Sequence, residues 1–251
     1  MTRLFICLIW ALSTSCFSAT LEFNSGKLPV QLIELYTSEG CSSCPKADRW
    51  LSNLSDDSGL WERFVPVAFH VDYWNRLGWE DRFSSSRYSR RQRTHRSEGN
   101  INSVYTPGFV VAGTEWRGWF SRQPLPTNNT NIIGNLQLRV SGNSRYIARF
   151  DQIEKKRTPL QLTVVILGMN LVTNVKHGEN AGKQLHHDFV VLDLIEEVSN
   201  DTLWQGKLPK FDTLVSFQNG ENIKSFAIAA WVSQVNNLRP IQSVGGYLKT
   251  P

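Results

Sequence analysis

Apolar runs of strand or helix length divide the first half of the chain. Residues 28–38 and 64–74 are nearly continuous apolar runs that predict buried strands, and apolar residues within 47–54 recur at the spacing of one helical face. The arginine-rich stretch 80–98 is typical of a surface helix, and two short strands follow it, joined by a turn at 112–114. The order strand, helix, strand, helix, strand, strand spans about a hundred residues, a usual size for one domain.

The second half has a different pattern. Short runs rich in Val, Ile, Leu and Phe are separated by Gly, Asn and Asp turns and show little helical periodicity, which favours a β-sandwich. Six such runs occupy 136–140, 145–150, 160–167, 189–195, 213–217 and 226–235. The pattern therefore predicts an α/β domain at 28–122 followed by an all-β sandwich-like domain at 132–251.

Residues 1–19 predict a signal peptide. Arg3 precedes an apolar run at 4–12, small residues follow it, and the run is too short to span a bilayer. Cys16 suggests a lipoprotein site, but Leu12 lies one residue too far upstream for a good match. We therefore expect a periplasmic or secreted protein, with a lipid anchor as the less favoured alternative and no later membrane-spanning segment.

Cysteine content and charge narrow the chemistry. Loss of the signal peptide removes Cys7 and Cys16, so the mature chain keeps Cys41 and Cys44. In an oxidising compartment a lone pair of cysteines normally becomes a disulfide. The net charge of +5 is mild, and nucleic acid is not an expected partner of an exported protein.

The two remaining cysteines stand in C-x-x-C spacing just before a predicted helix. Unpaired N–H groups and the positive end of the helix dipole favour the thiolate of Cys41, which is the nucleophile of disulfide exchange. Cys44 lies close enough to attack a mixed disulfide. Ser42 and Ser43 are small and polar, which makes them candidate substrate contacts that leave the sulfur accessible. The chemistry requires that the Cys41 sulfur be reachable from solvent.

These motifs carry a family resemblance. A strand, a C-x-x-C motif that opens a helix and a later "TP" dipeptide resemble the thioredoxin superfamily. The stretches IELYTSEGCSSCPKAD, HVDYWNRLGW, SVYTPGFVV and HGENAGKQL are similar to a secreted bacterial family of thioredoxin-like proteins of unknown function. The resemblance implies a thioredoxin-like fold for the first domain and a redox chemistry, and it brings no established substrate.

The resemblance also implies further site residues. Pro107 becomes the candidate cis-proline beside the cysteines, Thr106 faces them, and Glu34 becomes a buried carboxylate that accepts a proton from the second cysteine. In the alternative interpretation, Glu34 faces solvent or pairs with an arginine. By strand alternation Asp72 shares a face with His70, which allows a hydrogen-bonded pair, and it is a candidate substrate contact.

These features predict an exported thiol–disulfide oxidoreductase that acts on protein or small-molecule thiols without a cofactor. A disulfide here closes a loop of only four residues, and short loops stabilise a fold least, so a redox role is favoured over a structural one. Two alternatives stay open: the cysteines bind Cu(I) in a metallochaperone, or the disulfide is the inert scaffold of a binding module. A separate metal site among His177, His186 and His187 is not favoured, because no helical ligand spacing links them.

Overall fold

The computed structural model describes residues 20–142, 144–153, 158–209, 223 and 225–248. The predicted signal peptide at 1–19 and the predicted strand at 213–217 lie outside these residues. Within the described part of the chain, no helix is long and apolar enough to cross a membrane.

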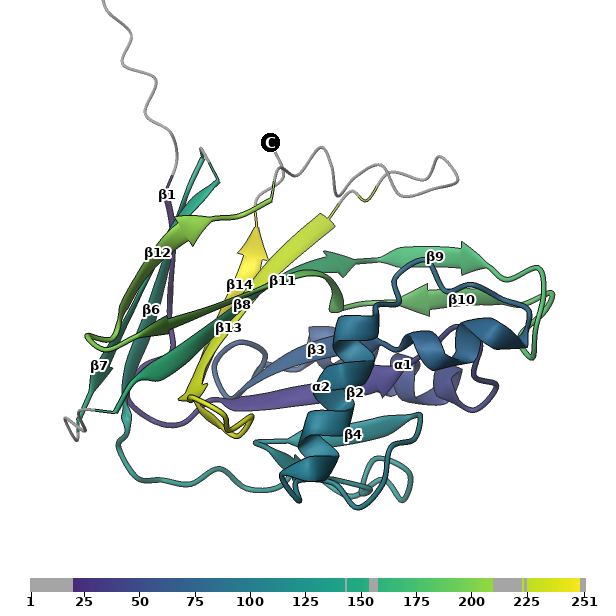
Figure 1. Cartoon of the computed structure of the whole chain (residues 1–251), viewed down its shortest axis with the longest axis horizontal. Coiled ribbons are helices and arrows are strands. Elements are labelled where there is room, and N and C mark those ends of the chain that lie inside the picture. Colours follow the sequence, from purple (N-terminus) through teal and green to yellow (C-terminus); the bar gives the residue numbers. More distant parts are fainter. Residues whose placement is uncertain (1–19, 143, 154–157, 210–222, 224, 249–251) are drawn as a thin grey trace, which may run out of the picture.

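Strands make up most of the regular structure (Figure 1). The helical segments are the α-helices α1 (Cys44–Ser52) and α2 (Ser86–Ser97) and the 3-10 helices η1 (Asn53–Asp56) and η2 (Asp72–Leu77). The strands up to the middle of the chain are β1 (Thr20–Asn24), β2 (Gln31–Thr37), β3 (Phe64–His70), β4 (Gly108–Val111), β5 (Thr114–Glu115), β6 (Gly134–Ser141) and β7 (Arg145–Gln152). The later strands are β8 (Leu160–Met169), β9 (Leu171–Asn174), β10 (Gln184–His187), β11 (Val190–Ser199), β12 (Leu203–Lys207), β13 (Ser225–Gln234) and β14 (Pro240–Leu248).

The described strands form one large sheet and two smaller ones. The large sheet has eight strands in the order β14-β13-β8-β11-β3-β2-β4-β5, in which β3 is parallel to β2 and β11 and the other neighbours are antiparallel. A four-stranded antiparallel sheet has the order β1-β6-β7-β12, and β9 pairs with β10 as a hairpin. In Figure 1 the four-stranded sheet lies at one end of the molecule and the hairpin lies at the other, beside α1.

The predicted fold class is therefore wrong. A thioredoxin-like α/β domain followed by a separate all-β sandwich-like domain requires a sheet that is complete within the first half. Instead β3 pairs with β11, where Ala68 is the partner of Val190, and the same sheet continues into β8, β13 and β14. The apolar pattern predicted most of these strands, but it does not contain the information about which strands become neighbours.

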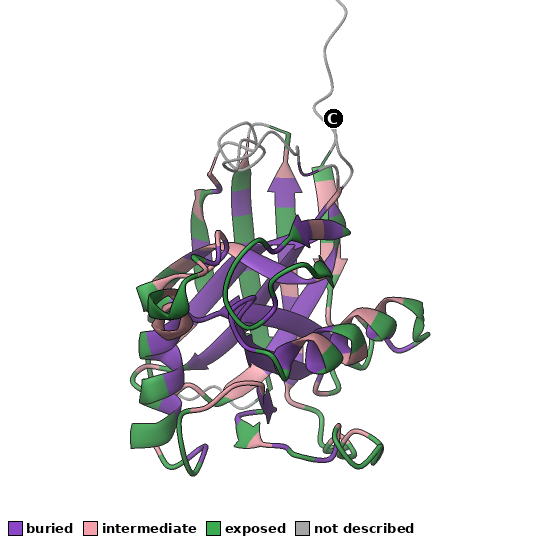
Figure 2. Ribbon diagram, turned by 90° about the vertical axis from the view of Figure 1, so that its right-hand side faces the viewer, coloured by how far each residue is buried: buried purple, intermediate pink, exposed green. Residues whose placement is uncertain are grey.

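Helices α1 and α2 cover opposite faces of the large sheet. Side chains alternate along β2, so that Thr37 donates a hydrogen bond to Asp48 of α1, whereas Glu34 accepts one from Arg91 of α2. Because both faces are covered, β2 and β3 are buried along their whole length and read as continuous apolar runs. Figure 2 shows the buried residues gathered in the central strands and the exposed residues on the outer faces of the helices.

Two hydrophobic cores lie against the large sheet. The first surrounds β2, β3 and α1 and includes Phe189 and Trp231 from the second half of the chain. The second fills the space between the four-stranded sheet and β8 and β13, with Phe150 and Ile228 among its members. Because β8 and β13 contribute alternate side chains to both cores, the two halves of the chain depend on one another for burial.

Candidate functional site

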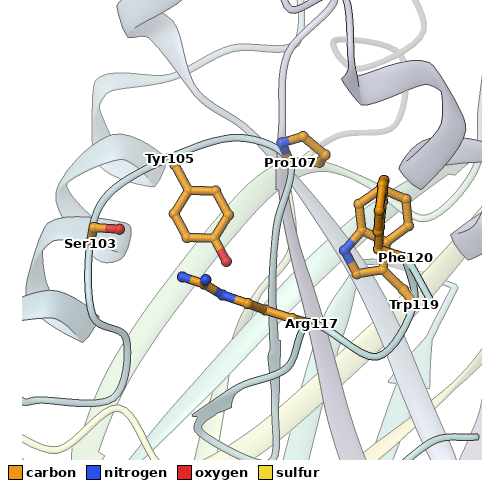
Figure 3. A pocket seen from close by; sticks show the side chains of 6 residues that line it. All are labelled: Ser103, Tyr105, Pro107, Arg117, Trp119 and Phe120. Carbon is orange, nitrogen blue, oxygen red and sulfur yellow. The ribbon is translucent and has the colours of Figure 1, made fainter. Parts of the chain in front are cut away.

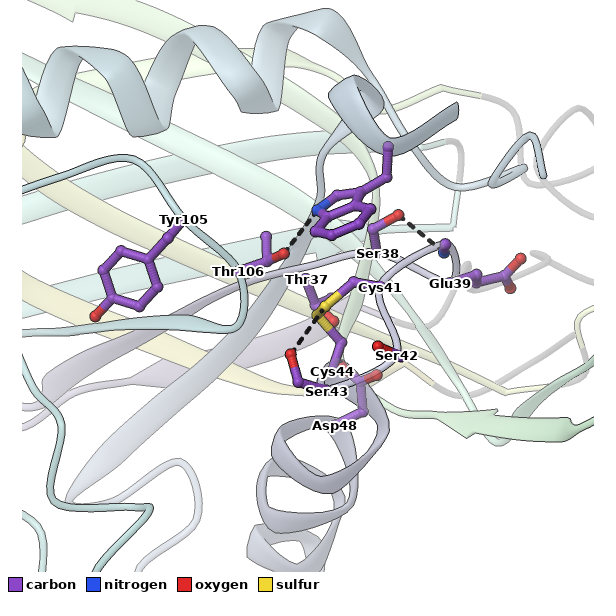
Figure 4. The surroundings of a disulfide bond; sticks show 12 residues. Thr37, Ser38, Glu39, Cys41, Ser42, Ser43, Cys44, Asp48, Tyr105 and Thr106 are labelled. Atoms are coloured by element: carbon purple, nitrogen blue, oxygen red, sulfur yellow. Dashed lines mark hydrogen bonds between the residues drawn. A yellow bond between two sulfur atoms is a disulfide. The ribbon is translucent and has the colours of Figure 1, made fainter. Parts of the chain in front are cut away.

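Cys41 and Cys44 form a disulfide at the amino end of α1 (Figure 4). After β2 the chain turns through 38–43, and the helix begins at Cys44 followed by Pro45, whose missing N–H is tolerated in the first turn. The Cys44 N–H donates to the Cys41 carbonyl at 3.2 Å, and the Ser43 hydroxyl lies 3.4 Å from the Cys41 sulfur. The predicted pairing of the two cysteines is confirmed.

Neither cysteine is open to solvent in this oxidised state. Cys41 is 1% exposed and Cys44 is fully buried, although Ser42 and Ser43 beside them are exposed. The prediction that the Cys41 sulfur is reachable is wrong for this closed arrangement. Any exchange reaction at Cys41 therefore requires that the side chains around it move.

Trp74 of η2 packs beside the cysteine loop. A Cβ atom at Gly40 would lie 3.1 Å from the Trp74 Cβ, so this close approach favours glycine at position 40. The indole N–H of Trp74 donates to the Thr106 hydroxyl at 2.8 Å, a hydrogen bond that is drawn in Figure 4. Trp74 thus links the loop before the cysteines to the residue before Pro107.

Pro107 lies beside the start of the cysteine loop. The Thr106–Pro107 peptide bond is cis, the conformation that the family resemblance implies. Gly108, the first residue of β4, pairs with Tyr36 near the end of β2. This register places the proline next to the point where the chain leaves β2 for the cysteines.

An open pocket of about 380 Å³ adjoins Pro107 (Figure 3). Its other lining residues are Ser103, Tyr105, Arg117, Trp119 and Phe120. Phe120 is 81% exposed, and the Arg117 guanidinium lies 5.3 Å from the centre of the Tyr105 ring. The Arg117 charge is paired with Glu115 at 2.8 Å, so aromatic surface dominates what the pocket offers.

Glu34 is buried, but on the face of the sheet opposite to the cysteine helix. Arg91 of α2 donates to its carboxylate at 2.7 Å, and His95 Nε2 lies 3.3 Å from it. Burial alone would raise the pKa of Glu34, but the charges of Arg91 and His95 outweigh burial and lower it from 4.5 to about 2. The alternative left open by the sequence, a pairing with an arginine, is the one observed, and Glu34 does not lie beneath Cys44.

A different set of side chains lies behind the cysteines. We call it the acid–histidine cluster, and its members are almost completely buried: Glu39 of the cysteine loop, Asp48 of α1, His70 at the end of β3, Asp81 after η2, and His187 at the end of β10. All five lie more than twenty residues from at least one other member, so the fold assembles them. Figure 4 shows Asp48 beside the cysteines and the Glu39 side chain pointing away from the disulfide.

Asp48 is the cluster member nearest to Cys44 along α1. It lies four residues, or one helical turn, after the cysteine, and its Oδ1 accepts from the Thr37 hydroxyl at 2.7 Å. Its Oδ2 has no hydrogen-bond partner among the described residues and lies 3.7 Å from His187 Nδ1. Burial raises the pKa of Asp48, and the nearby His187 and His70 only partly oppose that effect.

Glu39 completes the arrangement on the other side of His187. Its Oε1 lies 3.5 Å from His187 Nε2, and its Oε2 accepts from the Trp79 indole at 2.7 Å. His187 therefore lies between two carboxylates, at distances slightly too long for hydrogen bonds. Its two ring nitrogens have no hydrogen-bond partner within the described chain.

Asp72 does not form the predicted pair with His70. His70 Nδ1 lies 2.7 Å from Asp81, and Asp72 instead exchanges hydrogen bonds with Ser89 of α2. The 3-10 turn of η2 after β3 removes the strand alternation on which the prediction depended. The Asp72 carboxylate thus fixes η2 to α2.

The HGENAGK motif forms the end of the β9–β10 hairpin and holds the cysteine loop. The buried Asn180 side chain donates to the carbonyls of Glu39 at 2.8 Å and Cys41 at 2.9 Å. The exposed Glu179 accepts from the Ser42 N–H at 3.0 Å. Hydrogen bonds from the side chain and backbone of Ser42 lower the pKa of Glu179, which is therefore ionised at neutral pH.

Sequence reasoning missed the acid–histidine cluster and the role of the hairpin. The four-residue spacing between Cys44 and Asp48 was a usable signal, because it places both side chains on one helical face. No comparable signal joins Asn180 or His187 to the cysteines. Among the described residues, no group of three or more His, Cys, Asp or Glu side chains has a geometry suited to a metal ion, and His177 and His186 are exposed.

The comparisons with known proteins give a family and a fold. Residues 32–232 match the family model described as "Protein of unknown function (DUF1223)". The chain belongs to this family. A crystal structure of a protein from Agrobacterium tumefaciens is similar with a TM-score of 0.58 at 20% identity, over 89% of this chain and 99% of that one. HBP35 of Porphyromonas gingivalis is similar with a TM-score of 0.55 at 15% identity, over 89% and 76% of the two chains. No curated protein matches the chain.

Proposed function

We propose that this family member is a thiol–disulfide oxidoreductase in which Cys41 is the attacking cysteine and Cys44 the resolving one. The observation that supports this most strongly is the Asp48 carboxylate, which is buried one turn after Cys44 and has an oxygen without a hydrogen-bond partner. Its raised pKa brings the carboxylate closer to the pKa of a thiol, which favours proton transfer between them. A purely structural disulfide has no need of such a group.

The proposed reaction oxidises the protein dithiol and reduces a partner disulfide. The Cys41 thiolate attacks one partner sulfur, the partner S–S bond breaks, and the first partner thiolate leaves and takes a proton from water. The Cys44 thiol then gives its proton to Asp48, and its thiolate attacks the Cys41 sulfur of the mixed disulfide. The Cys41–Cys44 bond forms, the second partner thiolate leaves, and Asp48 returns its proton to solvent.

The partner in this proposal is a protein or small-molecule disulfide. The C-x-x-C pair and the proline at 107 resemble those of the thioredoxin superfamily, and we carry over that chemistry without the fold. The pocket beside Pro107 supports a peptide partner, because the exposed Phe120 and the partly exposed Trp119 give it aromatic surface. Export through the predicted signal peptide is part of the same proposal.

A second candidate function is a binding module with a scaffold disulfide. The 1% exposure of Cys41 favours it, because a covered sulfur cannot be attacked without a local opening. The two candidates differ in a simple measurement on the native chain. An exchangeable disulfide is reduced by dithiothreitol without denaturant, whereas a scaffold disulfide is reduced only at urea concentrations that unfold the chain.

The first experiment traps the intermediate. The Cys44→Ser variant is mixed with glutathione disulfide, and mass spectrometry is expected to find one glutathione on Cys41, whereas Cys41→Ser should remain unmodified. A native disulfide that resists dithiothreitol, together with a Cys44→Ser variant that gains no adduct, would reject the oxidoreductase and favour the scaffold.

The second experiment tests Asp48. In Asp48→Asn the resolution of the mixed disulfide at pH 7 is expected to slow about tenfold to a hundredfold, because the proton acceptor is lost. The wild-type and variant rates should converge at alkaline pH, where Cys44 ionises without help. Asp56→Asn is the matched control, because Asp56 is an exposed carboxylate in η1. Equal rates for the two variants at pH 7 would remove Asp48 from the mechanism.

A further inference from the structure

The exposed carboxylate of Glu179 is bonded to the backbone of the C-x-x-C motif. The Ser42 N–H that it accepts at 3.0 Å belongs to the peptide bond that follows Cys41. Ser42 lies two residues before the first residue of α1, so its N–H is not one of the first-turn groups of the helix, and Glu179 supplies its hydrogen-bond acceptor. The contact brings a negative charge to within a few bonds of the Cys41 sulfur.

The position of Glu179 is built into the hairpin. Its neighbour Asn180 is fully buried and donates to the carbonyls on either side of Gly40, those of Glu39 and Cys41. Lys183 donates to the Asn180 side-chain oxygen at 2.9 Å, which orients the amide so that its NH2 group faces the cysteine loop. These contacts hold the end of the hairpin, and therefore Glu179, against Ser42.

We propose that Glu179 is a positioning residue that sets the redox equilibrium of the Cys41–Cys44 pair in favour of the disulfide. A negative charge beside Cys41 disfavours its thiolate, and a less stable thiolate makes the dithiol form less stable relative to the disulfide. The chain is thus poised to give electrons to partner disulfides. This inference rests on the proposed function.

The measured reaction is the exchange of the native chain with glutathione. The protein disulfide and two glutathione thiols give the protein dithiol and one glutathione disulfide, so that two electrons and two protons pass to the protein. Glu179→Gln removes the charge and keeps a side-chain oxygen that can accept from Ser42. The pKa of the Cys41 thiol is expected to fall by about half a unit, as is typical of one exposed charge, and the equilibrium constant for reduction to rise by up to about threefold.

The dependence of this equilibrium constant on ionic strength distinguishes an effect of charge from an effect of loop conformation. At about 1 M salt the Debye length falls to about 3 Å, so the difference between wild type and Glu179→Gln should shrink towards zero. Glu62→Gln is the matched control. Glu62 is exposed and precedes β3, at the end of the β2–β3 pair opposite to the cysteines, and its removal should leave the equilibrium unchanged.

The outcomes separate this inference from the proposed function. A wild-type disulfide that exchanges readily, with the same equilibrium constant in Glu179→Gln, overturns the role of Glu179 and leaves the oxidoreductase intact. A shift that persists unchanged at 1 M salt also overturns it, because loop shape and not charge would then be the cause. A wild-type disulfide that fails to exchange under native conditions overturns both.

Discussion

His70 and Asp81 form a buried ion pair behind the cysteine loop. Their side chains are fully buried, and His70 Nδ1 lies 2.7 Å from Asp81 Oδ2. Burial would lower the pKa of His70, but the attraction of Asp81 outweighs burial and raises it from 6.5 to about 9. Burial would likewise raise the pKa of Asp81, but His70 and the N–H groups of Glu39 and Phe83 lower it. Both groups are therefore charged at neutral pH.

The pair predicts a loss of stability at alkaline pH. The folded chain holds the His70 proton more tightly than the unfolded chain, so this contribution is complete below pH 6.5 and is lost as the pH rises through about 9. Since one unit of pKa difference corresponds to about 1.4 kcal/mol, the free energy of unfolding should fall by roughly 3 kcal/mol over this range. Urea titrations of the oxidised protein at pH 6, 7.5 and 9.5 measure the loss.

The His70→Gln variant is the control for this prediction. It cannot titrate, so its stability should be lower at pH 6 and change less between pH 6 and 9.5. Asp81 has the opposite pH dependence. Because its pKa is lowered in the folded chain, it contributes stability above pH 3.8 that is lost as the pH falls into the acid range. A wild-type protein and a variant with parallel pH profiles would show that His70 is neutral in the folded state.

Glu34 shows that the sequence can leave the partner of a carboxylate open. It lies in an apolar strand, which allowed either a buried proton acceptor for the second cysteine or a group that faces solvent or pairs with an arginine. Which face of the strand it occupies depends on where α1 and α2 pack, and Thr37, three residues later, takes the face towards α1. The proton acceptor is instead Asp48 in our proposal, because the helix that carries Cys44 also carries Asp48 on the same side.

The β9–β10 hairpin is the element that ties the second half of the chain to the cysteines. Its loop contains Gly178 and Gly182, both with positive φ angles, which let the chain turn tightly enough to present Asn180. A Cβ atom at Gly178 would lie 3.2 Å from the Trp79 Cβ, so the loop also packs against the segment after η2. The HGENAGK motif is therefore a clamp on the cysteine loop.

Removal of the clamp should weaken the fold. Asn180→Ala leaves the carbonyls of Glu39 and Cys41 without their buried donor, and the free energy of unfolding is expected to fall by about 1–3 kcal/mol. Asn174→Ala in the same hairpin is the control. Asn174 is exposed and accepts a hydrogen bond from Gln184, so its loss should cost less than about 0.5 kcal/mol. Equal urea midpoints for the two variants would contradict the clamp.

The whole molecule depends on a sheet that both halves share. The edge of β3 is covered by β11, and the first core takes Phe189, Val191 and Trp231 from beyond residue 132. A chain cut at residue 122 would expose that edge and lose those side chains. An uncovered apolar strand edge favours aggregation over independent folding.

We therefore expect that residues 20–122 do not fold alone. The fragment should show no cooperative urea transition by tryptophan fluorescence and circular dichroism, whereas residues 20–251 should show one. Addition of the complementary fragment 123–251 should restore part of the native signal if the two halves share one sheet. A cooperative transition of the short fragment would restore the two-domain interpretation.

The pattern along the chain determined the elements, and the tertiary structure decided their neighbours. The runs that became β2, β3, β8 and β13 were visible because burial on both faces selects continuous apolar residues, and the C-x-x-C spacing and the "TP" dipeptide are local features. Short or half-exposed strands such as β1 and β12 were missed, because a few alternating residues do not differ from a loop. The contacts that make the site join residues far apart, as Asn180 and Cys41 are 139 positions apart. Hydrophobic periodicity indicates whether a residue is buried and in which type of element it lies. Which distant residue it contacts is decided by how the sheets and helices pack.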